Sequence, residues 1–294
     1  MDTKRSAVIF AWLLLAPALI YILLIVAYPL LDTINLSFTD ASLKRTYDWV
    51  GLENYFKIFE RGFGEVILRT FIWTFFSVAA KMVIGVFGAV LLSAAVPGRT
   101  LFRVLTMPPW IVPMAIGIFM WGWMYNGQFG MISGLLQRFG LLDGPFPILA
   151  TGTSAFIATI VTDVWIGVPM VTIYMLAAVQ SIPSDLYEAA WTDGAGRFYR
   201  FRRITLPLIV PALVTMSMIS LISTFNSFDI IWILTKGGPS NATTTMIIDT
   251  YKVAIGSYKF GAGAARAVLI CIFLSIFCYV YFRAVSRFSG EAAR

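Results

Sequence analysis

Histidine is absent from this 294-residue chain, and cysteine occurs only twice. Without histidine, the sequence lacks the commonest general base and the usual protein ligand of zinc and haem. Cys271 and Cys278 are related as i and i+7, a rise of about 10 Å on a helix, which is beyond the reach of a disulfide. The phosphate-binding pattern G-x-x-x-x-G-K-[ST] is missing as well. These absences speak against an enzyme and indicate that any ATP-driven activity needs a partner.

Charged side chains are also scarce, at 13% of residues, whereas hydrophobic residues make up 59% and the mean hydropathy is +0.82. Soluble domains carry about 25% charged residues, so this composition is typical of a polytopic membrane protein. Lipid leaves a spanning chain only helices or a closed barrel, because every backbone polar group must be satisfied internally. The long, continuous apolar runs favour helices, and the sequence therefore predicts an all-α membrane protein.

Six apolar runs reach the length of about 20 residues that a helix needs to cross the hydrocarbon. They occupy residues 8–30, 66–96, 103–125, 154–179, 204–234 and 262–281. The first run is too long for the apolar core of a signal peptide and lacks a small-residue cleavage site, so we interpret it as a retained helix. Pro108, Pro109 and Pro113 predict a break in the third run, as either a hinge or a packing kink.

Lysine and arginine are unevenly distributed between the segments that join these runs. The densest cluster, Arg197, Arg200, Arg202 and Arg203, lies between the fourth and fifth runs. Because cytoplasmic loops carry an excess of basic residues, this asymmetry predicts that both termini and the arginine cluster are cytoplasmic. The net charge of +7 is then explained by membrane topology and contact with anionic lipids rather than by nucleic-acid binding.

Polar residues recur inside the fifth run at helical spacing. Ser220, Ser223, Thr224 and Ser227 stand at i, i+3, i+4 and i+7, which predicts one hydroxyl-bearing face. Such residues can line a path for a polar ligand, or they can serve as small packing residues that bond to their own helix. Both interpretations stay open, although the neighbouring Asn226 adds polarity that packing does not require.

The fourth run carries one acid, Asp163, followed by Gly167 and Met170 on the same helical face. A charge inside an apolar span is costly, so Asp163 is expected to face protein or a water-filled cavity. Gly167 would let a ligand approach the backbone. Acidic, hydroxyl and aromatic groups together suit a sugar, which presents hydroxyls and flat apolar faces.

Three cations also lie in or near the apolar runs. Arg69 and Arg266 are close to external ends and are predicted to extend their side chains to the outer interface. Lys81 falls within the second run, and no feature of the sequence explains it.

The segment between the fourth and fifth runs has its own helical signals. Ser184 is a candidate N-cap, with Asp185 and Glu188 in the first turns where the helix dipole favours acids. Gly194 and Gly196 predict a sharp reversal, because glycine accepts positive φ. Two stripes at helical spacing follow, an aromatic one of Phe198 and Phe201 and a basic one of Arg197, Arg200 and Arg203. Together they predict an amphipathic helix at the membrane surface. A solvated connector whose arginines only set topology is the alternative.

This segment resembles the signature loop of ABC importer permease subunits in the E-A-A, G and I-x-L-P spacing. The matching positions are Glu188, Ala189, Ala190, Gly194, Ile204, Leu206 and Pro207. In that family the loop docks into a cleft on the ATP-hydrolysing subunit. The resemblance therefore implies that Glu188 pairs with a basic residue of that partner and that the chain has the type I importer transmembrane domain.

Residues 165–169 and 180–187 resemble the larger maltose-type permease of the carbohydrate uptake branch, as do the G-G-P and T-T-T elements at 237–239 and 243–245. Family members hold sugar at mid-membrane with residues of the fourth and fifth helices. The positions implied here are Asp163, Ile166, Gly167, Met170, Ser220, Ser223, Thr224 and Ser227. Asp163 replaces an amide of the maltose-type pattern and Met170 a tyrosine, which argues against maltose itself.

The resemblance also implies the assembly in which the chain works, in a bacterial inner membrane. Its expected partners are a second, non-identical permease, two ATP-binding cassette subunits that hold ATP and magnesium, a periplasmic sugar-binding protein and the lipid bilayer. No cofactor or metal is expected in this chain. Three regions are predicted: residues 1–65 with one helix and a periplasmic loop, 66–287 with the transmembrane domain and a coupling loop at 181–207, and a cytoplasmic tail at 288–294. Aromatic residues predict a short amphipathic helix in the periplasmic loop: Tyr55, Phe56, Phe59 and Phe63.

Other functions remain as alternatives at this point. An ion-coupled secondary transporter of a small polar solute could use Asp163 or Asp229 as a relay. A membrane-embedded enzyme would need convergent acid, base or metal groups. An importer permease for amino acids or metals is a third possibility. Among carbohydrates, glycerol phosphate and acidic sugars stay open because Lys81 or the partner permease could offset Asp163.

Overall fold

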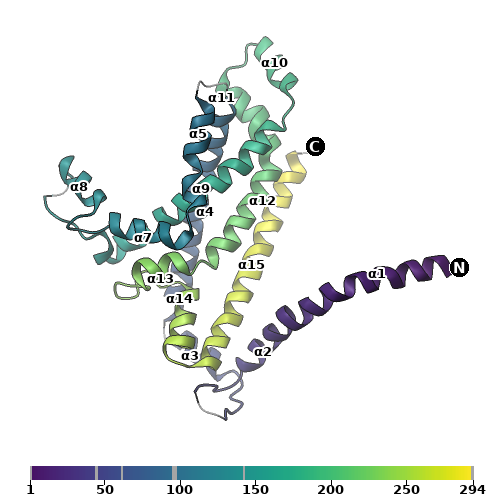
Figure 1. Cartoon of the computed structure of the whole chain (residues 1–294), viewed down its shortest axis with the longest axis vertical. Helices are drawn as coiled ribbons and strands as arrows, with labels where there is room; N and C mark the ends of the chain where they lie inside the picture. The colour runs from purple at the N-terminus through teal and green to yellow at the C-terminus, as the bar shows by residue number, and fades with distance from the viewer. Residues whose placement is uncertain (1, 44–45, 61, 95–97, 142, 293–294) are drawn as a thin grey trace. The chain divides into compact units, whose positions relative to one another are not determined.

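The computed structural model describes residues 2–43, 46–60, 62–94, 98–141 and 143–292, with the backbone alone for residues 2–6 and 284–292. Apart from one isolated bridge between Thr39 and Trp49, the regular structure in these ranges is helical. The chain divides into two compact units, Met1–Gly64 with Asp249–Ile272, and Glu65–Ile248 with Phe273–Arg294. Figure 1 labels their helices.

Five described helices are long and apolar enough to cross a membrane, and one bent helix pair brings the number to six. The five are Ala7–Leu36, Phe63–Ser93, Gly152–Gln180, Arg197–Phe225 and Phe260–Arg283, and the bent pair is Arg99–Ile111 with Met114–Met124. The prediction of an all-α protein with six spans is confirmed. Val96, at the predicted end of the second run, lies outside the described residues.

The first unit contains the N-terminal span and the loop that follows it. Its elements are α1 (Asp2–Tyr21), the π-helical η1 (Ile22–Ala27), α2 (Tyr28–Leu36), α3 (Glu53–Glu60), the end of α14 (Met246–Tyr251), the π-helical η4 (Lys252–Gly256) and the start of α15 (Phe260–Ala292). The most apolar window of the N-terminal span has no buried residue within this chain. This window is therefore available to lipid or to another protein.

Hydrogen bonds from α3 fold the loop after the N-terminal span back on itself. The side-chain amide of Asn54 donates to the carbonyl oxygens of Ser37 and Thr39, at 2.9 and 2.8 Å, and the Tyr55 hydroxyl lies 2.7 Å from Ser37 Oγ. The predicted short helix is confirmed, but its buried face is formed by Asn54 and Ile58. Phe56 and Phe59 are exposed and Phe63 belongs to α4, so the aromatic spacing did not identify the buried face.

Arg266, in α15, is buried and does not extend to an interface. Its Nε donates to Asp249 Oδ2 at 2.7 Å, its Nη1 donates to the carbonyl oxygen of Ala262 at 3.0 Å, and the guanidinium lies over the ring of Phe63. The predicted snorkelling is wrong for Arg266, because an acid elsewhere in the fold supplies a partner that satisfies the buried cation.

The second unit contains the four middle spans and the segments that join them. Its elements are most of α4 (Phe63–Ser93), α5 (Arg99–Thr106), α6 (Pro108–Ile111), α7 (Met114–Met124), α8 (Met131–Arg138), the 3-10 helix η2 (Ile148–Ala150), α9 (Gly152–Gln180), α10 (Ser184–Thr192), α11 (Arg197–Arg200), the π-helical η3 (Phe201–Thr205), α12 (Leu206–Phe225), α13 (Asp229–Thr235) and the start of α14. The latter part of α15 also belongs to this unit.

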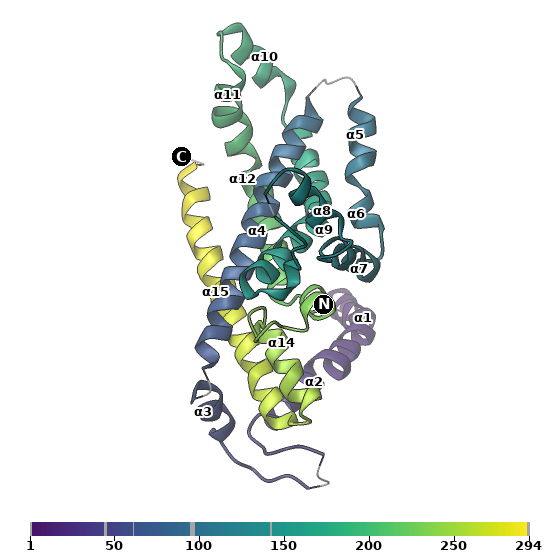
Figure 2. The same ribbon diagram turned by 90° about the vertical axis from the view of Figure 1, so that its left-hand side faces the viewer.

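Two of the six predicted apolar runs are interrupted. The third run is bent by 96° between α6 and α7, around Val112 and Pro113, so the break predicted from its prolines is confirmed. Figure 2 shows the change of direction between the two helices. The fifth run was expected to continue to Leu234, which is wrong. α12 ends at Phe225, where the side-chain amide of Asn226 donates to the carbonyl oxygen of Ile222 at 2.9 Å and satisfies a terminal acceptor.

The last helix is longer than its apolar run. α15 extends from Phe260 to Ala292, beyond the predicted limits of 262 and 281. The predicted tail at 288–294 includes residues 293–294, which lie outside the described residues.

The core of the second unit is formed where α4, α9 and α12 meet. Met82 and Val86 of α4 cluster with Val171 and Met175 of α9 and with Ile209 of α12. Gly85 permits this approach, because a Cβ at that position would lie 2.8 Å from Val171 Cβ and closer still to its Cγ1. The glycine therefore sets how closely α4 and α9 pack.

We expect Gly85→Ala to destabilise the protein by about 1–3 kcal/mol, because the added methyl group overpacks the contact with Val171. Gly64→Ala, in the same helix, is the matched control, since no atom lies within 4 Å of its Cβ position and alanine favours a helix over glycine by about 0.5–1 kcal/mol. Thermal unfolding in detergent measures both. Equal melting temperatures for the two variants would contradict the close approach of α4 and α9.

Candidate functional site

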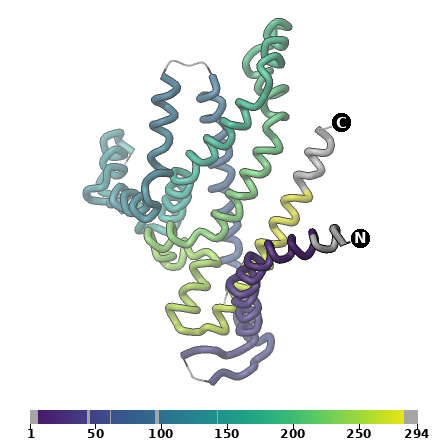
Figure 3. Tube along the Cα trace, turned by 45° about the vertical axis from the view of Figure 1, so that its right-hand side comes forward, coloured from purple at the N-terminus to yellow at the C-terminus, as the bar shows by residue number. Residues whose placement is uncertain are grey.

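The segment that carries the E-A-A positions forms a helical hairpin. α10 ends near Thr192, Gly194 turns the chain with φ of 78°, and α11 begins at Arg197 (Figure 3). Backbone bonds close the turn, from Ala195 N to the carbonyl oxygen of Ala190 and from Gly194 N to that of Trp191, both at 2.9 Å. The reversal predicted at Gly194 is confirmed.

Two local predictions for this hairpin are wrong. α10 begins at Ser184, the capping position falls on Pro183, and no side chain caps the helix. Gly196 has φ of −66° and ψ of 164°, an extended conformation open to any residue, so Gly194 alone needs positive φ.

The arginine cluster belongs to a membrane span and does not form a separate surface helix, which corrects the prediction. α11, η3 and α12 form one continuous helical run, Arg197–Phe225. The signature residues Ile204, Leu206 and Pro207 lie within this run, in its π-helical and first α-helical turns. A rigid element therefore connects the hairpin to the middle of the fifth span.

α10 is attached to this run at one internal point and otherwise presents its polar face outward. The hydroxyl of Tyr187 lies 2.9 Å from Thr205 Oγ1 in η3. Glu188 and Ala189 are exposed and Ala190 is half-buried. The carboxylate of Glu188 is thus available to a partner, and the small alanine side chains beside it leave room for close docking.

The second group of predicted site residues surrounds a buried ion pair. Asp163 of α9 and Lys81 of α4 are 6% and 4% exposed, and Lys81 Nζ lies 2.7 Å from Asp163 Oδ2. Lys81 Nζ also donates to Thr224 Oγ1 of α12, at 2.7 Å. Three spans are therefore connected through one ammonium group, which explains the lysine that the sequence left unexplained.

Gly167 provides the space for this ammonium group. A Cβ at Gly167 would overlap Cδ of Lys81 and come within 3.4 Å of both its Cε and Nζ. In this structure the glycine thus admits the lysine side chain, whereas the sequence analysis expected it to admit a ligand. The sequence did contain a signal for this ion pair. Asp163 is the one acid in the fourth predicted span and Lys81 is a central cation in the second, and two opposite charges inside membrane helices are expected to pair.

The remaining predicted substrate positions divide into buried and exposed groups. Ser220 is buried, and Ile166 is half-buried. Met170 is 43% exposed, and Ser223 is exposed with its hydroxyl donating to the carbonyl oxygen of Ser220 at 3.1 Å. Among the predicted positions, Met170 and Ser223 are the two whose side chains another molecule can reach directly.

Ser227 is not part of the predicted hydroxyl face. It lies in the break between α12 and α13, where its backbone N–H donates to the carbonyl oxygen of Thr224 at 3.0 Å. The helical spacing therefore holds for Ser220, Ser223 and Thr224, and fails after α12 ends.

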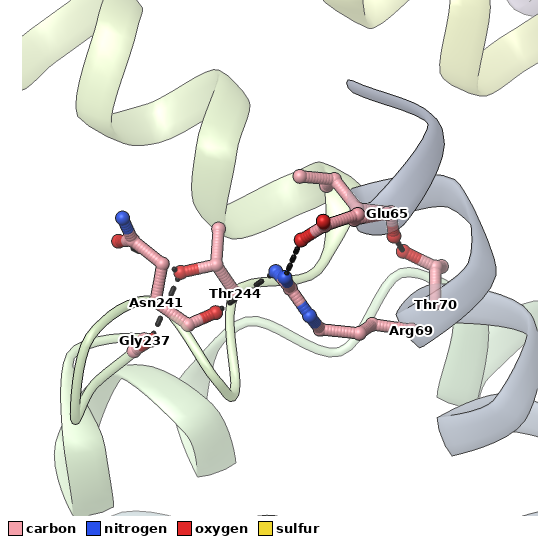
Figure 4. A network of polar contacts seen from close by, with 7 residues as sticks. Glu65, Arg69, Thr70, Gly237, Asn241 and Thr244 are labelled. Atoms are coloured by element: carbon pink, nitrogen blue, oxygen red, sulfur yellow. Dashed lines mark hydrogen bonds and ion pairs between the residues drawn. The ribbon is translucent and has the colours of Figure 1, made fainter. Parts of the chain in front are cut away.

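The loop with the G-G-P and T-T-T elements is hydrogen-bonded to α4, a contact that the sequence did not predict (Figure 4). Arg69 Nη1 donates to the carbonyl oxygen of Asn241 at 3.0 Å, and its Nη2 lies 2.5 Å from Glu65 Oε2. Met246 N donates to Thr70 Oγ1 at 2.9 Å. Thr244 Oγ1 donates to the carbonyl oxygen of Gly237 at 2.9 Å, a bond drawn in Figure 4. The three threonines at 243–245 are buried, and the hydroxyls of Thr243 and Thr244 donate to the carbonyl oxygens of Gly238 and Gly237 within the loop.

The chain has six helical spans, and the hairpin of α10 and α11, which carries the E-A-A positions, is continuous with the fifth. These features together define the transmembrane subunit of an importer. Residues 6–288 match the family model described as binding-protein-dependent transport system inner membrane component, and the chain belongs to this family. It is accordingly a multi-pass inner-membrane protein, and its family consists of transport subunits. This assignment argues against the secondary-transporter and membrane-enzyme alternatives.

Individual relatives extend the comparison. The trehalose/maltose transport system permease protein MalF of Thermococcus litoralis is 35% identical over 283 residues, which cover 95% of this chain and 94% of that protein. The maltodextrin transport system permease protein MalC of Streptococcus pneumoniae is 30% identical, with 96% and 70% covered. A solved bacterial ABC transporter involved in import of the acidic polysaccharide alginate has a chain with the same fold, at a TM-score of 0.84, 21% identity and 97% coverage of both chains. The resemblance to sugar importer permeases is confirmed.

Lys81→Met should destabilise the protein by about 3–5 kcal/mol, because it leaves the Asp163 carboxylate buried without its counter-ion. The double variant Lys81→Met/Asp163→Leu should recover most of that loss, since neither charge remains. Thermal unfolding of the variants in detergent measures the difference. A single variant as stable as the parent, or a double variant no better than the single, would contradict the role of the pair.

Proposed function

We propose that this chain is the membrane-spanning subunit through which an ATP-driven importer translocates a carbohydrate. The exposed Glu188 on a hairpin that is continuous with the fifth span is the observation on which the proposal depends. The sugars named for the relatives from Thermococcus litoralis and Streptococcus pneumoniae supply the substrate class. Neither ATP nor magnesium binds in this chain under the proposal, and no cofactor is required.

The hairpin is the proposed docking element for an ATP-binding cassette subunit. Glu188 pairs with a basic residue of that subunit, while Ala189 and Ala190 permit close approach. Two such subunits hydrolyse ATP, a second and non-identical permease completes the path, and an external sugar-binding protein delivers the substrate. The excess of arginine at 197–203 supports a cytoplasmic hairpin with both termini on the same side.

Transmission from ATP to the substrate follows the continuous run Arg197–Phe225. The run carries the signature residues Ile204, Leu206 and Pro207 toward one end and Ser220, Ser223 and Thr224 toward the other. A displacement of the hairpin therefore moves the hydroxyl-bearing face and, through Thr224, the Lys81 ammonium group. Binding of ATP or of sugar shifts the equilibrium between two conformations by its differential affinity for them.

The substrate contacts proposed first are Met170 and Ser223, because both are exposed. Asp163, Ile166, Gly167, Ser220, Thr224 and Ser227 remain proposed members of the same site. Lys81 compensates the charge of Asp163, so the face has no net charge, which suits a neutral sugar.

Replacing Glu188 with lysine should reduce sugar uptake and binding-protein-stimulated ATP hydrolysis at least tenfold, because loss of a buried charge pair across an interface costs about 2–5 kcal/mol. The amount of inserted protein should not change, since Glu188 is exposed in this chain. Asp193→Lys makes the same change of charge in the same hairpin and should retain uptake. Normal uptake by Glu188→Lys would exclude the docking role, and equal loss in both variants would assign it to the overall charge of the hairpin.

Ser223→Ala should lower the apparent affinity for some sugars by about 2- to 10-fold, the effect of removing one neutral hydrogen bond. The matched control is Ser217→Ala on the same helix, whose hydroxyl already bonds Tyr281 and the carbonyl oxygen of Val214. Competition by maltose, trehalose and a maltodextrin against uptake of a labelled sugar measures the change. An altered amount of protein with unchanged sugar preference would favour the packing interpretation of Ser223.

A further inference from the structure

Two adjoining cavities lie beside the start of the fifth span. The first has a volume of about 610 Å³ and is lined by polar groups of α4, α9, α10 and the arginine segment, among them Ser93, Gln180, Tyr187, Arg197 and Arg200. The second, of about 750 Å³, is almost entirely apolar and follows α4 and α12, with Val83, Phe87, Phe198, Leu206 and Leu213 in its wall. Val90, Arg197 and Phe201 line both, so the two cavities are neighbours, one forming a polar end and the other an apolar end.

The polar end has unpaired positive charge. Within the described part of the chain, no carboxylate pairs with Arg197 or Arg200. Nε of Arg200 is buried and has no hydrogen-bond partner among the described residues. A buried donor without an acceptor is costly, and guanidinium groups bind phosphate well because their donors match its oxygens. The polar end is therefore suited to a phosphate-bearing group.

The apolar end is suited to an apolar part of the same ligand. Its wall consists of aliphatic and aromatic side chains, several of them exposed in this chain, including Val83, Phe87 and Phe198 at 70%, 64% and 75%. These residues belong to two membrane spans, whereas the arginines stand at the end of one span. A molecule that fills both cavities must have an anionic head and an apolar tail, oriented as in a bilayer leaflet.

We propose that this site binds an anionic phospholipid, with the phosphate on Arg197 and Arg200 and an acyl chain in the groove between α4 and α12. The charge complementarity favours a lipid over a second protein, because a protein occupant would have to supply a buried carboxylate to each arginine as well as an apolar surface. Tyr187 lines the polar end and lies in α10, one residue before Glu188. The bound lipid thus holds the hairpin against α4 and supports its coupling to ATP hydrolysis.

The test uses the complete transporter in nanodiscs of phosphatidylcholine, with increasing fractions of phosphatidylglycerol. Native mass spectrometry counts retained phosphatidylglycerol, and ATP hydrolysis is measured in parallel. Arg197→Gln/Arg200→Gln should lose the retained lipid and need at least tenfold more phosphatidylglycerol for half-maximal hydrolysis. Arg202→Gln/Arg203→Gln removes the same charge from exposed neighbours that do not line the site, and should behave as the parent. Equal retention by the two double variants would overturn the proposal.

Two further arms identify the occupant. Val83→Trp, at an exposed position in the groove, should lower lipid retention without a change of charge; unchanged retention would exclude the acyl-chain site. Added inorganic phosphate should not replace phosphatidylglycerol in supporting hydrolysis, and full replacement would assign the polar end to a dissolved anion. Cross-linking of Phe198→Cys to the second permease at high yield would assign the groove to that subunit and overturn the proposal.

The hydrolysis readout rests on the proposed importer function, whereas the lipid count does not. Glu188→Lys should therefore retain phosphatidylglycerol while losing stimulated hydrolysis. Loss of lipid binding in the arginine variant alone, with hydrolysis unaffected, would contradict the coupling role of the lipid. It would leave the importer function intact.

Discussion

The Lys81–Asp163 ion pair is the contact on which the arrangement of the second unit depends. A charged side chain at the centre of a membrane helix costs about 2.5–3.5 kcal/mol on insertion scales, so two unpaired charges would oppose insertion of α4 and α9. Their separation of 2.7 Å offsets this cost only when the helices meet in one register. Thr224 adds α12 to the same contact. One ammonium group thus specifies how three spans face one another.

Packing around the pair follows from this register. Gly167 gives the lysine side chain its space on α9, and Gly85, one turn beyond Lys81 on α4, lets the two helices approach each other. α11, η3 and α12 form one continuous run from Arg197 to Phe225. The same run therefore sets both the position of Thr224 beside the ion pair and the position of the hairpin. The π-helical turn η3 lies between them, in the stretch that contains Ile204 and Thr205. The signature motif therefore specifies backbone geometry as well as an exposed carboxylate.

The sequence predicted features that depend on one segment at a time. Apolar length identified the spans, the prolines identified the break in the third, and Gly194 identified the turn of the hairpin. Errors arose where a residue's partner lies on another segment. Arg266 is satisfied by Asp249, so it does not need water, and Lys81 and Asp163 are explained only when α4 faces α9. Helical periodicity gives the angle of a side chain around the axis of its helix. It does not say which neighbouring helix that side of the helix packs against.

Polar groups in these spans therefore fall into two kinds, and the distinction indicates where other molecules bind. Lys81, Asp163 and Thr224 satisfy one another and specify the fold. Glu188 is exposed, whereas Nε of Arg200 is buried without a hydrogen-bond partner among the described residues, although a buried polar group requires one. A chain that folds as one member of an assembly leaves such groups unsatisfied at the surfaces its partners cover. Glu188 lies in α10 and Arg200 in α11, so the proposed protein and lipid contacts converge on the hairpin that opens the fifth span.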